Sequence, residues 1–113
     1  MTIYIGKEKF KSEVLTKTSD LEKGMMGRKK LDGCMVFDIG KGYHSFWMKD
    51  CLIPLDIVFV NKGKITKIYL NCPPEKNSKT YTKYTGTGDM VIEFPGNTAK
   101  NWKVNDKVTF VKD

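Results

Sequence analysis

The stretch FWMKDCLIPLDIVFV, residues 46–60, decides the fold because it is an apolar, strand-like run that also contains one cation and two carboxylates. The charged residues in it are Lys49, Asp50 and Asp56. Burying an unpaired charge costs on the order of several kcal/mol or more. These side chains are therefore expected either to cap turns at the surface or to form a paired polar site.

Short alternating segments and tight turns surround this stretch, which is the pattern of β-strands. Two strand pieces are predicted around Gly6 within residues 3–15, and a helix of about two turns is predicted from Thr18 to Gly24 or Gly27. Ser19 and Glu22 have the spacing of a capping box at its start. Further strands are predicted over 34–39, 43–49, 56–60, 65–70, 90–94 and 107–111, with a turn at 40–42 and a long polar loop at 71–89.

This order of elements predicts one domain spanning residues 1–113 with a mainly β fold. The expected architecture is a small antiparallel β-sandwich or barrel, with one short helix. No stretch of the chain has the length and hydropathy of a signal peptide or a membrane span, so a soluble, cytoplasmic protein is expected. The three cysteines are widely spaced and predict neither a disulfide framework nor a zinc site.

The net charge of +7 allows a polyanionic partner, but the distribution of that charge disfavours nucleic acid. Lysines are scattered through nearly every segment, and no basic helix or RNA-binding motif is present. Arg28 is the only arginine. Because a guanidinium offers a planar fork of donors, Arg28 is a candidate for anion binding, although a salt bridge at a helix end would satisfy the same geometry.

Strand alternation puts Trp47 and Lys49 on one face, where they can form the wall of a site for a planar or sugar-like ligand. A core tryptophan beside a lysine that extends to the surface explains the pattern equally well. Asp56 and Glu93 lie in apolar strands, either as an acid/base pair or as anchors for Arg28 and Lys49. Methionine and cysteine sulfurs are concentrated near this region, but no spacing fixes a coordination geometry, so no metal or cofactor is predicted.

Several motifs together resemble the family called domain of unknown function 192. They are GMMGR at 24–28, Gly33, HSFWMKDCLIPLDIVFV at 44–60 and MVIEFPG at 90–96. The resemblance implies a mainly β, jelly-roll-like or barrel domain with relatives in bacteria, archaea and some phages, and it implies no established activity. The family's characteristic residues fall on Gly24, Met26, Arg28, Gly33, Phe46, Trp47, Met48, Lys49, Pro54, Leu55, Asp56 and Glu93.

The leading hypothesis is a domain that binds a small anionic or carbohydrate-like ligand between the turn at 24–28 and the segment 47–56. In this hypothesis Arg28 and Lys49 supply charge, Trp47 and Met26 form an apolar wall, and Asp56 orients the cations. One alternative is a phage or bacterial accessory protein that has no small-molecule ligand and docks on another protein or a polyanion. A second is an enzyme that uses Asp56 or Glu93 as a base with Arg28 and Lys49. The sequence does not specify an oligomeric state.

Overall fold

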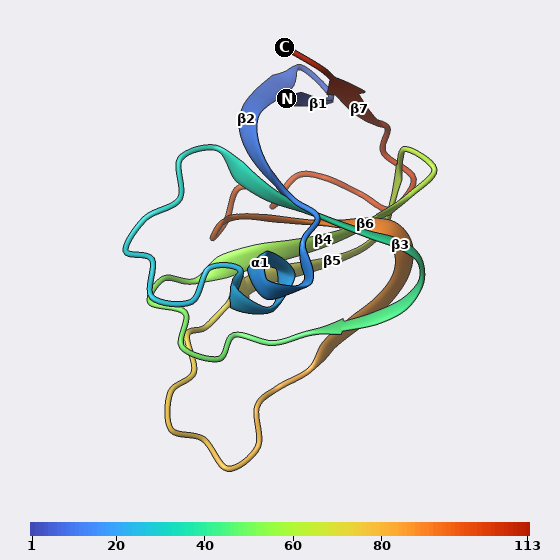
Figure 1. Cartoon of the computed structure of the whole chain (residues 1–113). Coiled ribbons are helices and arrows are strands. Elements are labelled where there is room, and N and C mark those ends of the chain that lie inside the picture. The colour runs from blue at the N-terminus through green and yellow to red at the C-terminus, as the bar shows by residue number, and fades with distance from the viewer.

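A computed structural model describes all 113 residues as seven strands and one short helix (Figure 1). The elements are β1 (Thr2–Ile5), β2 (Glu8–Leu15), α1 (Thr18–Lys23), β3 (Cys34–Phe46), β4 (Leu55–Asn61), β5 (Lys64–Cys72), β6 (Tyr84–Pro95) and β7 (Val108–Val111). The strands form one sheet in the order β5-β4-β6-β3-β2-β1-β7. This sheet curls into a half-barrel, and the mainly β fold with one short helix is confirmed.

The sheet is mixed rather than fully antiparallel, because β2 pairs with β3 in parallel. Residues 16–33, which include α1, connect these two strands. A crossover of that length is what parallel neighbours require, whereas every other pair of neighbouring strands is antiparallel. All seven strands belong to a single sheet, so the predicted sandwich and jelly-roll forms are not confirmed.

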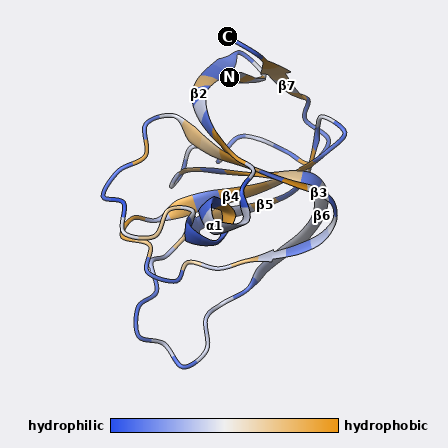
Figure 2. Cartoon of the chain, viewed as in Figure 1, coloured by the Kyte–Doolittle hydropathy of each residue, from blue (hydrophilic) through white to orange (hydrophobic).

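Two apolar clusters lie on the two faces of the central strands. One cluster contains Val58, Ile92 and Phe94 together with residues of β1 and β7. The other contains Ile57 and Phe59, and the partly buried Leu21 of α1 packs against it. The first six residues of β4 are all buried, as in a strand covered on both faces. Figure 2 shows hydrophobic residues along the central strands and hydrophilic residues in the loops.

Three local predictions differ from the structure. The helix begins at Thr18 after Lys17, which makes no side-chain cap, so the capping box of Ser19 and Glu22 does not form. The predicted turn at 40–42 is an irregularity inside β3, between Asp38 and Gly42. Strand β6 begins within the predicted loop, at Tyr84. Gly86 explains this last difference, because a Cβ there would come within 2.7 Å of the Phe59 ring, so the glycine serves packing rather than a turn.

The two ends of the chain meet at one end of the half-barrel. The Met1 ammonium lies 2.7 Å from a carboxylate oxygen of Asp113. The outer strands also approach each other, since Lys64 forms an isolated bridge with Lys107 and the Val108 amide donates to the Gly63 carbonyl. The structure contains no helix with the length and hydropathy that crossing a membrane requires.

Candidate functional site

Glu93 lies in a small pocket beside α1. The pocket has a volume of about 120 Å³, and it is bounded by α1 and the turn after it, by β3, and by the segment 47–51 that follows β3. Glu93 enters it from β6, the strand between β3 and β4. Its neighbours across the sheet are Met35 and Ile57, both in the cluster against which Leu21 of α1 packs. Strand alternation therefore points Glu93 toward the face that α1 covers.

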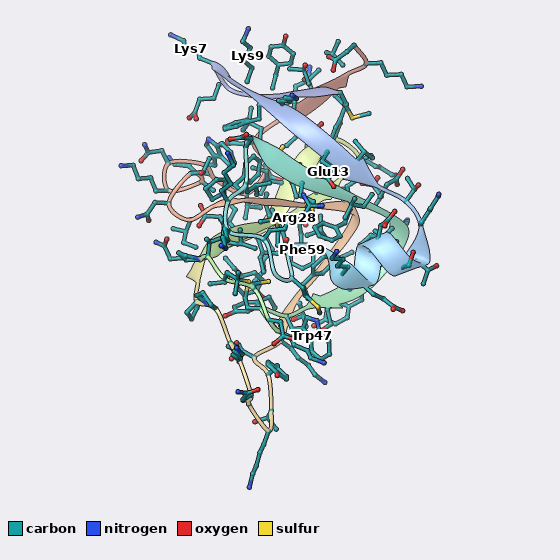
Figure 3. All side chains as sticks on the ribbon, turned by 60° about the vertical axis from the view of Figure 1, so that its left-hand side comes forward. Lys7, Lys9, Glu13, Arg28, Trp47 and Phe59 are labelled. Carbon is teal, nitrogen blue, oxygen red and sulfur yellow. The ribbon has the colours of Figure 1, made fainter.

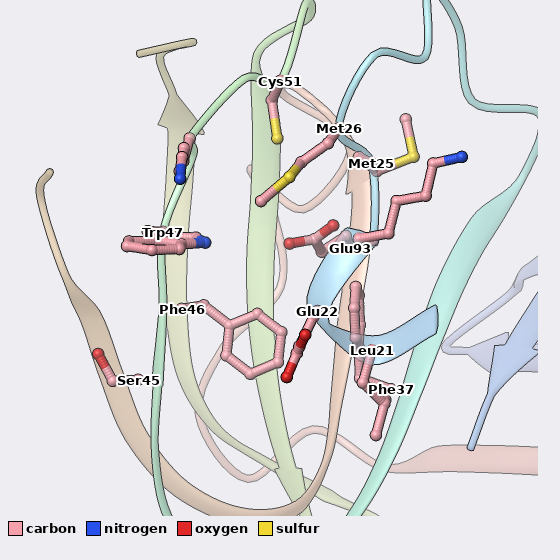
Figure 4. A pocket seen from close by; sticks show the side chains of 13 residues that line it. Leu21, Glu22, Met25, Met26, Phe37, Ser45, Phe46, Trp47, Cys51 and Glu93 are labelled. Atoms are coloured by element: carbon pink, nitrogen blue, oxygen red, sulfur yellow. The ribbon is translucent and has the colours of Figure 1, made fainter. Parts of the chain in front are cut away.

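The carboxyl group of Glu93 is buried and has no charged partner. Its side chain is only 3% exposed, its Oε1 atom has no hydrogen-bond partner in the protein, and neither of the two ion pairs in the structure includes it. Figure 4 shows the carboxyl group between the side chain of Met26 and the ring of Phe46. Burial raises the pKa of Glu93 to about 8, because the ionised form loses its hydration. At neutral pH the group is mainly a neutral acid that can donate a hydrogen bond.

Trp47 and Lys49 form one rim of the pocket, and Tyr81 packs beside them outside its lining. The rings of Trp47 and Tyr81 meet edge to face with centroids 5.4 Å apart. The Lys49 ammonium lies 5.2 Å from the Trp47 centroid and 5.9 Å from that of Tyr81. The Trp47 side chain is 45% exposed, so one part of it packs and another part faces solvent. Both Trp47 and Lys49 line the pocket, but β3 ends at Phe46 and Phe46 lines the pocket too, so the predicted strand alternation does not explain their position.

The turn after α1 supplies the methionines. Gly24 ends the helix with a φ of +46°, a conformation that glycine adopts readily. Met26 then pairs with Cys51 in an isolated β-bridge, and the Gly27 amide donates to the Asp50 carbonyl at 2.9 Å. These backbone contacts hold the turn against the segment 47–51, which places Met26 in the pocket with Trp47, Lys49 and Glu93.

Arg28 lies outside this pocket. Its guanidinium forms two hydrogen bonds with the carboxylate of Glu13, at 2.6 and 2.8 Å, and both side chains remain substantially exposed. Figure 3 shows this pair on the ribbon above Trp47. The pair lowers the pKa of Glu13 through the hydrogen bonds to Arg28. The prediction that Arg28 and Lys49 together charge one cleft is therefore wrong, because the arginine closes a surface salt bridge instead.

Asp56 also lies elsewhere, on the opposite face of the sheet. Its neighbour across β4 and β6 is Phe94, which belongs to the cluster that contains Val58 and Ile92. Its Oδ1 atom accepts hydrogen bonds from the amides of Asn71 and Asn97 at 2.8 and 3.0 Å, and Oδ2 accepts one from Ala99 at 2.8 Å. Asp56 on β4 thus binds the end of β5 and the segment that follows β6. The predictions that it orients Arg28 and Lys49, or forms a pair with Glu93, are wrong.

The pocket also includes residues that the sequence did not single out for it. Met25, Phe37, Phe46 and Cys51 complete its apolar walls. Phe46 belongs to the stretch that named the family, but Tyr81 comes from the polar loop between β5 and β6, where no sequence pattern marks it. Glu75 brings this loop to the site, since its amide donates to the Met48 carbonyl and its carbonyl accepts from the Asp50 amide.

The cysteines are buried thiols. Burial raises the pKa of Cys34 and Cys51 to about 12 and that of Cys72 to about 11, and the charges of Glu93 and Asp50 add to the effect at Cys51. High pKa values keep these groups as thiols rather than as nucleophilic thiolates. The structure contains no group of three or more histidine, cysteine or acidic side chains arranged to hold a metal ion.

The fold and the pocket define a small curled β-domain with a buried, unpaired carboxyl group beside a half-exposed tryptophan. The chain belongs to the family domain of unknown function 192 (DUF192), described as "Uncharacterized ACR", whose sequence profile matches residues 1–110. The family that the sequence motifs suggested is thereby confirmed. No curated protein matches the chain.

Two crystal structures are similar to this chain. One is a protein of unknown function from Novosphingobium aromaticivorans, with a TM-score of 0.80 and 29% identity, covering 96% of this chain and 82% of that one. The other, from Sinorhizobium meliloti, is described as a "putative transcription regulator". It has a TM-score of 0.81 and 24% identity and covers 96% of this chain and 89% of its own. At that identity the likeness concerns the fold alone.

Proposed function

We propose that this domain binds a small anionic or carbohydrate-like ligand in the pocket of Glu93. The observation that carries the proposal is the buried Glu93 carboxyl group, which has no ion-pair partner and whose Oε1 atom has no hydrogen-bond partner in the protein. Leaving a buried polar group unpaired costs about 1–3 kcal/mol. A ligand that hydrogen-bonds to Glu93 recovers that free energy.

The remaining lining has the composition of a small-molecule site. Ligand pockets combine apolar and aromatic walls with a few polar groups that fix orientation. Here Met26 and Phe46 supply apolar walls, Glu93 and Lys49 supply polar groups, and Trp47 offers a ring on which a sugar face or an aliphatic chain can lie. The site proposed from the structure thus keeps Met26, Trp47, Lys49 and Glu93 and omits Arg28 and Asp56.

The test is a thermal-shift and calorimetric screen of monosaccharides and small carboxylates against the wild type, Trp47→Ala and Tyr43→Ala. Tyr43 is a matched control because it is a 72% exposed aromatic residue that does not line the pocket. A ligand of this site should stabilise the wild type and Tyr43→Ala and bind Trp47→Ala at least about tenfold more weakly, given ~1.4 kcal/mol for a lost aromatic contact. A ligand that binds all three equally is bound elsewhere and contradicts the proposal.

The raised pKa of Glu93 favours a second candidate, an enzyme in which this carboxylate is a general base. Asp56 and Arg28 have no part in it, because each is held by its own partners away from the pocket. Any such rate should rise with pH until about 8 and then level, as Glu93 ionises. A rate that is independent of pH between 6 and 9, or unchanged in Glu93→Gln, contradicts this candidate.

A further inference from the structure

Glu93 and Lys49 line the same pocket without touching each other. No atom of the Lys49 ammonium comes within 4.0 Å of the Glu93 carboxyl group, since the ion pairs of the chain are Arg28 with Glu13 and Met1 with Asp113. The ammonium lies instead over the rings of Trp47 and Tyr81. The pocket therefore presents two separate hydrogen-bonding groups to whatever enters between them.

The charges around the pocket favour an anion over a cation. Two lysines, Lys23 and Lys49, line the pocket, and Glu22 is the one exposed carboxylate among the lining residues. The strand residues Phe37, Ser45 and Phe46 carry no charge, and the Cys51 thiol stays neutral. Asp50 is next to Cys51, outside the lining. Because burial keeps Glu93 mainly protonated at neutral pH, it does not repel an anion and can donate a hydrogen bond to one. A cationic ligand would meet the Lys49 ammonium and no ionised carboxylate at the floor.

The size and walls of the pocket limit what the anion carries. Its volume of about 120 Å³ is slightly smaller than the ~150 Å³ cavity that holds a benzene molecule. Met25, Phe37 and Phe46 make much of the wall apolar. A strongly hydrated anion such as sulfate would lose its water against these side chains, whereas a carboxylate on a short hydrocarbon chain places its apolar part there.

We propose that the ligand is a small monocarboxylate whose carboxylate group lies between the carboxylic acid of Glu93 and the ammonium of Lys49 and accepts a hydrogen bond from each. This inference rests on the proposed function and chooses the carboxylate class within it. Trp47 and the methionine side chains contact the hydrocarbon part of the ligand. Carbohydrates, which can use the same aromatic wall, lack the negative charge that this arrangement selects.

A matched series of ligands tests the class on the wild-type protein. Butyrate, butyramide and butylammonium have similar size and differ in charge, and glucose represents the carbohydrates. At pH 6.5, titration calorimetry should give butyrate an affinity at least about tenfold above those of the other three, equivalent to ~1.4 kcal/mol. Tighter binding of butyramide, butylammonium or glucose overturns the carboxylate inference and leaves the proposed pocket function intact. If no compound of this series, and none of the sugar and carboxylate screen, binds, then both the carboxylate inference and the proposed pocket function are overturned.

Variants and pH then locate the carboxylate. Lys49→Met should weaken butyrate binding about tenfold or more. Lys67→Met, which removes a lysine over the ring of Tyr69 and outside the pocket lining, should change nothing. Wild-type affinity should fall about tenfold between pH 6.5 and pH 9 as Glu93 loses its proton. Glu93→Gln keeps a neutral donor, so its affinity should stay within about threefold of wild type at pH 6.5 and not fall with pH. Equal pH dependence in both proteins overturns the inference.

Discussion

Asp56 and Glu93 lie on adjacent strands of one sheet and point to opposite faces of it. Asp56 is opposite Phe94 in the register of β4 and β6, and Glu93 is opposite Ile57, so the one-residue offset reverses their directions. Both carboxyl groups are buried, but Asp56 accepts three backbone hydrogen bonds and Oε1 of Glu93 accepts none. The first carboxylate holds the fold together, and the second is available to a ligand.

Asp56→Asn should destabilise the protein by about 2 kcal/mol or more, because an amide nitrogen would replace the oxygen that accepts from Ala99 and set two donors against each other. Asp38→Asn is a matched control, since Asp38 is exposed at the irregularity in β3 and makes no side-chain hydrogen bond. Urea unfolding measures both. Equal free energies of unfolding for the two variants would show that the fold does not depend on the three hydrogen bonds that Asp56 accepts.

Glu93 should make stability fall as pH rises. With a folded-state pKa of about 8 against an ordinary value of 4.5, the folded protein keeps a proton that the unfolded chain releases. The stabilisation that this retained proton gives the folded state is fully present below pH 4.5 and is lost as pH rises to about 8. The two pKa values differ by about 3.5 units, and each unit corresponds to 1.36 kcal/mol. The contribution of Glu93 to the free energy of unfolding is therefore at most about 5 kcal/mol.

Glu93→Gln removes this titration and serves as the reference. The free energy of unfolding of the wild type minus that of Glu93→Gln should decrease steadily between pH 5 and pH 8, and then level. Other titrating groups cancel in the difference. A difference that stays constant over this range would mean that Glu93 is ionised in the folded state, with a partner that the structure does not provide.

The cysteine thiols should be nearly inert in the folded protein. A pKa of about 12 leaves Cys51 with roughly 10³-fold less thiolate at pH 8 than a thiol of the ordinary value 9.0. Its reaction with a disulfide reagent at pH 8 should be slower by about that factor than in urea, where all three cysteines react. Fast labelling of Cys51 itself in the folded protein would contradict this and identify it as an activated nucleophile rather than a part of the pocket wall.

Arg28→Met should leave binding in the Glu93 pocket unchanged, because Arg28 pairs with Glu13 outside it. An exposed ion pair contributes about 0–1 kcal/mol, so the free energy of unfolding should fall by no more than that. Lys49→Met provides the contrasting variant. If Arg28→Met bound a pocket ligand more weakly than Lys49→Met, Arg28 would have to contribute to the binding site, which would contradict this prediction.

The sequence predicted the strands well where alternation and turns were regular, and it identified the family through the stretch 46–60. It grouped Arg28, Lys49 and Asp56 incorrectly. A charged residue in an apolar stretch predicts that some partner exists, but it does not identify that partner. The partners of Asp56 are backbone amides, which nearly every residue has, so the residue types do not reveal which of them bind it. The register that separates Asp56 from Glu93, and the loop contacts that bring Tyr81 to Lys49, exist only in three dimensions.

The central claim, that the Glu93 pocket is a binding site for a small carboxylate, is tested most directly by NMR of the six methionine methyl groups during a butyrate titration. Met25 and Met26 line the pocket, whereas Met1 and Met90 lie outside it. The account predicts saturable shifts at Met25 and Met26, absent from Met1 and Met90 and shifted to about tenfold higher butyrate concentrations in Lys49→Met. Shifts spread over all six methyl groups, or none at Met25 and Met26, would contradict it.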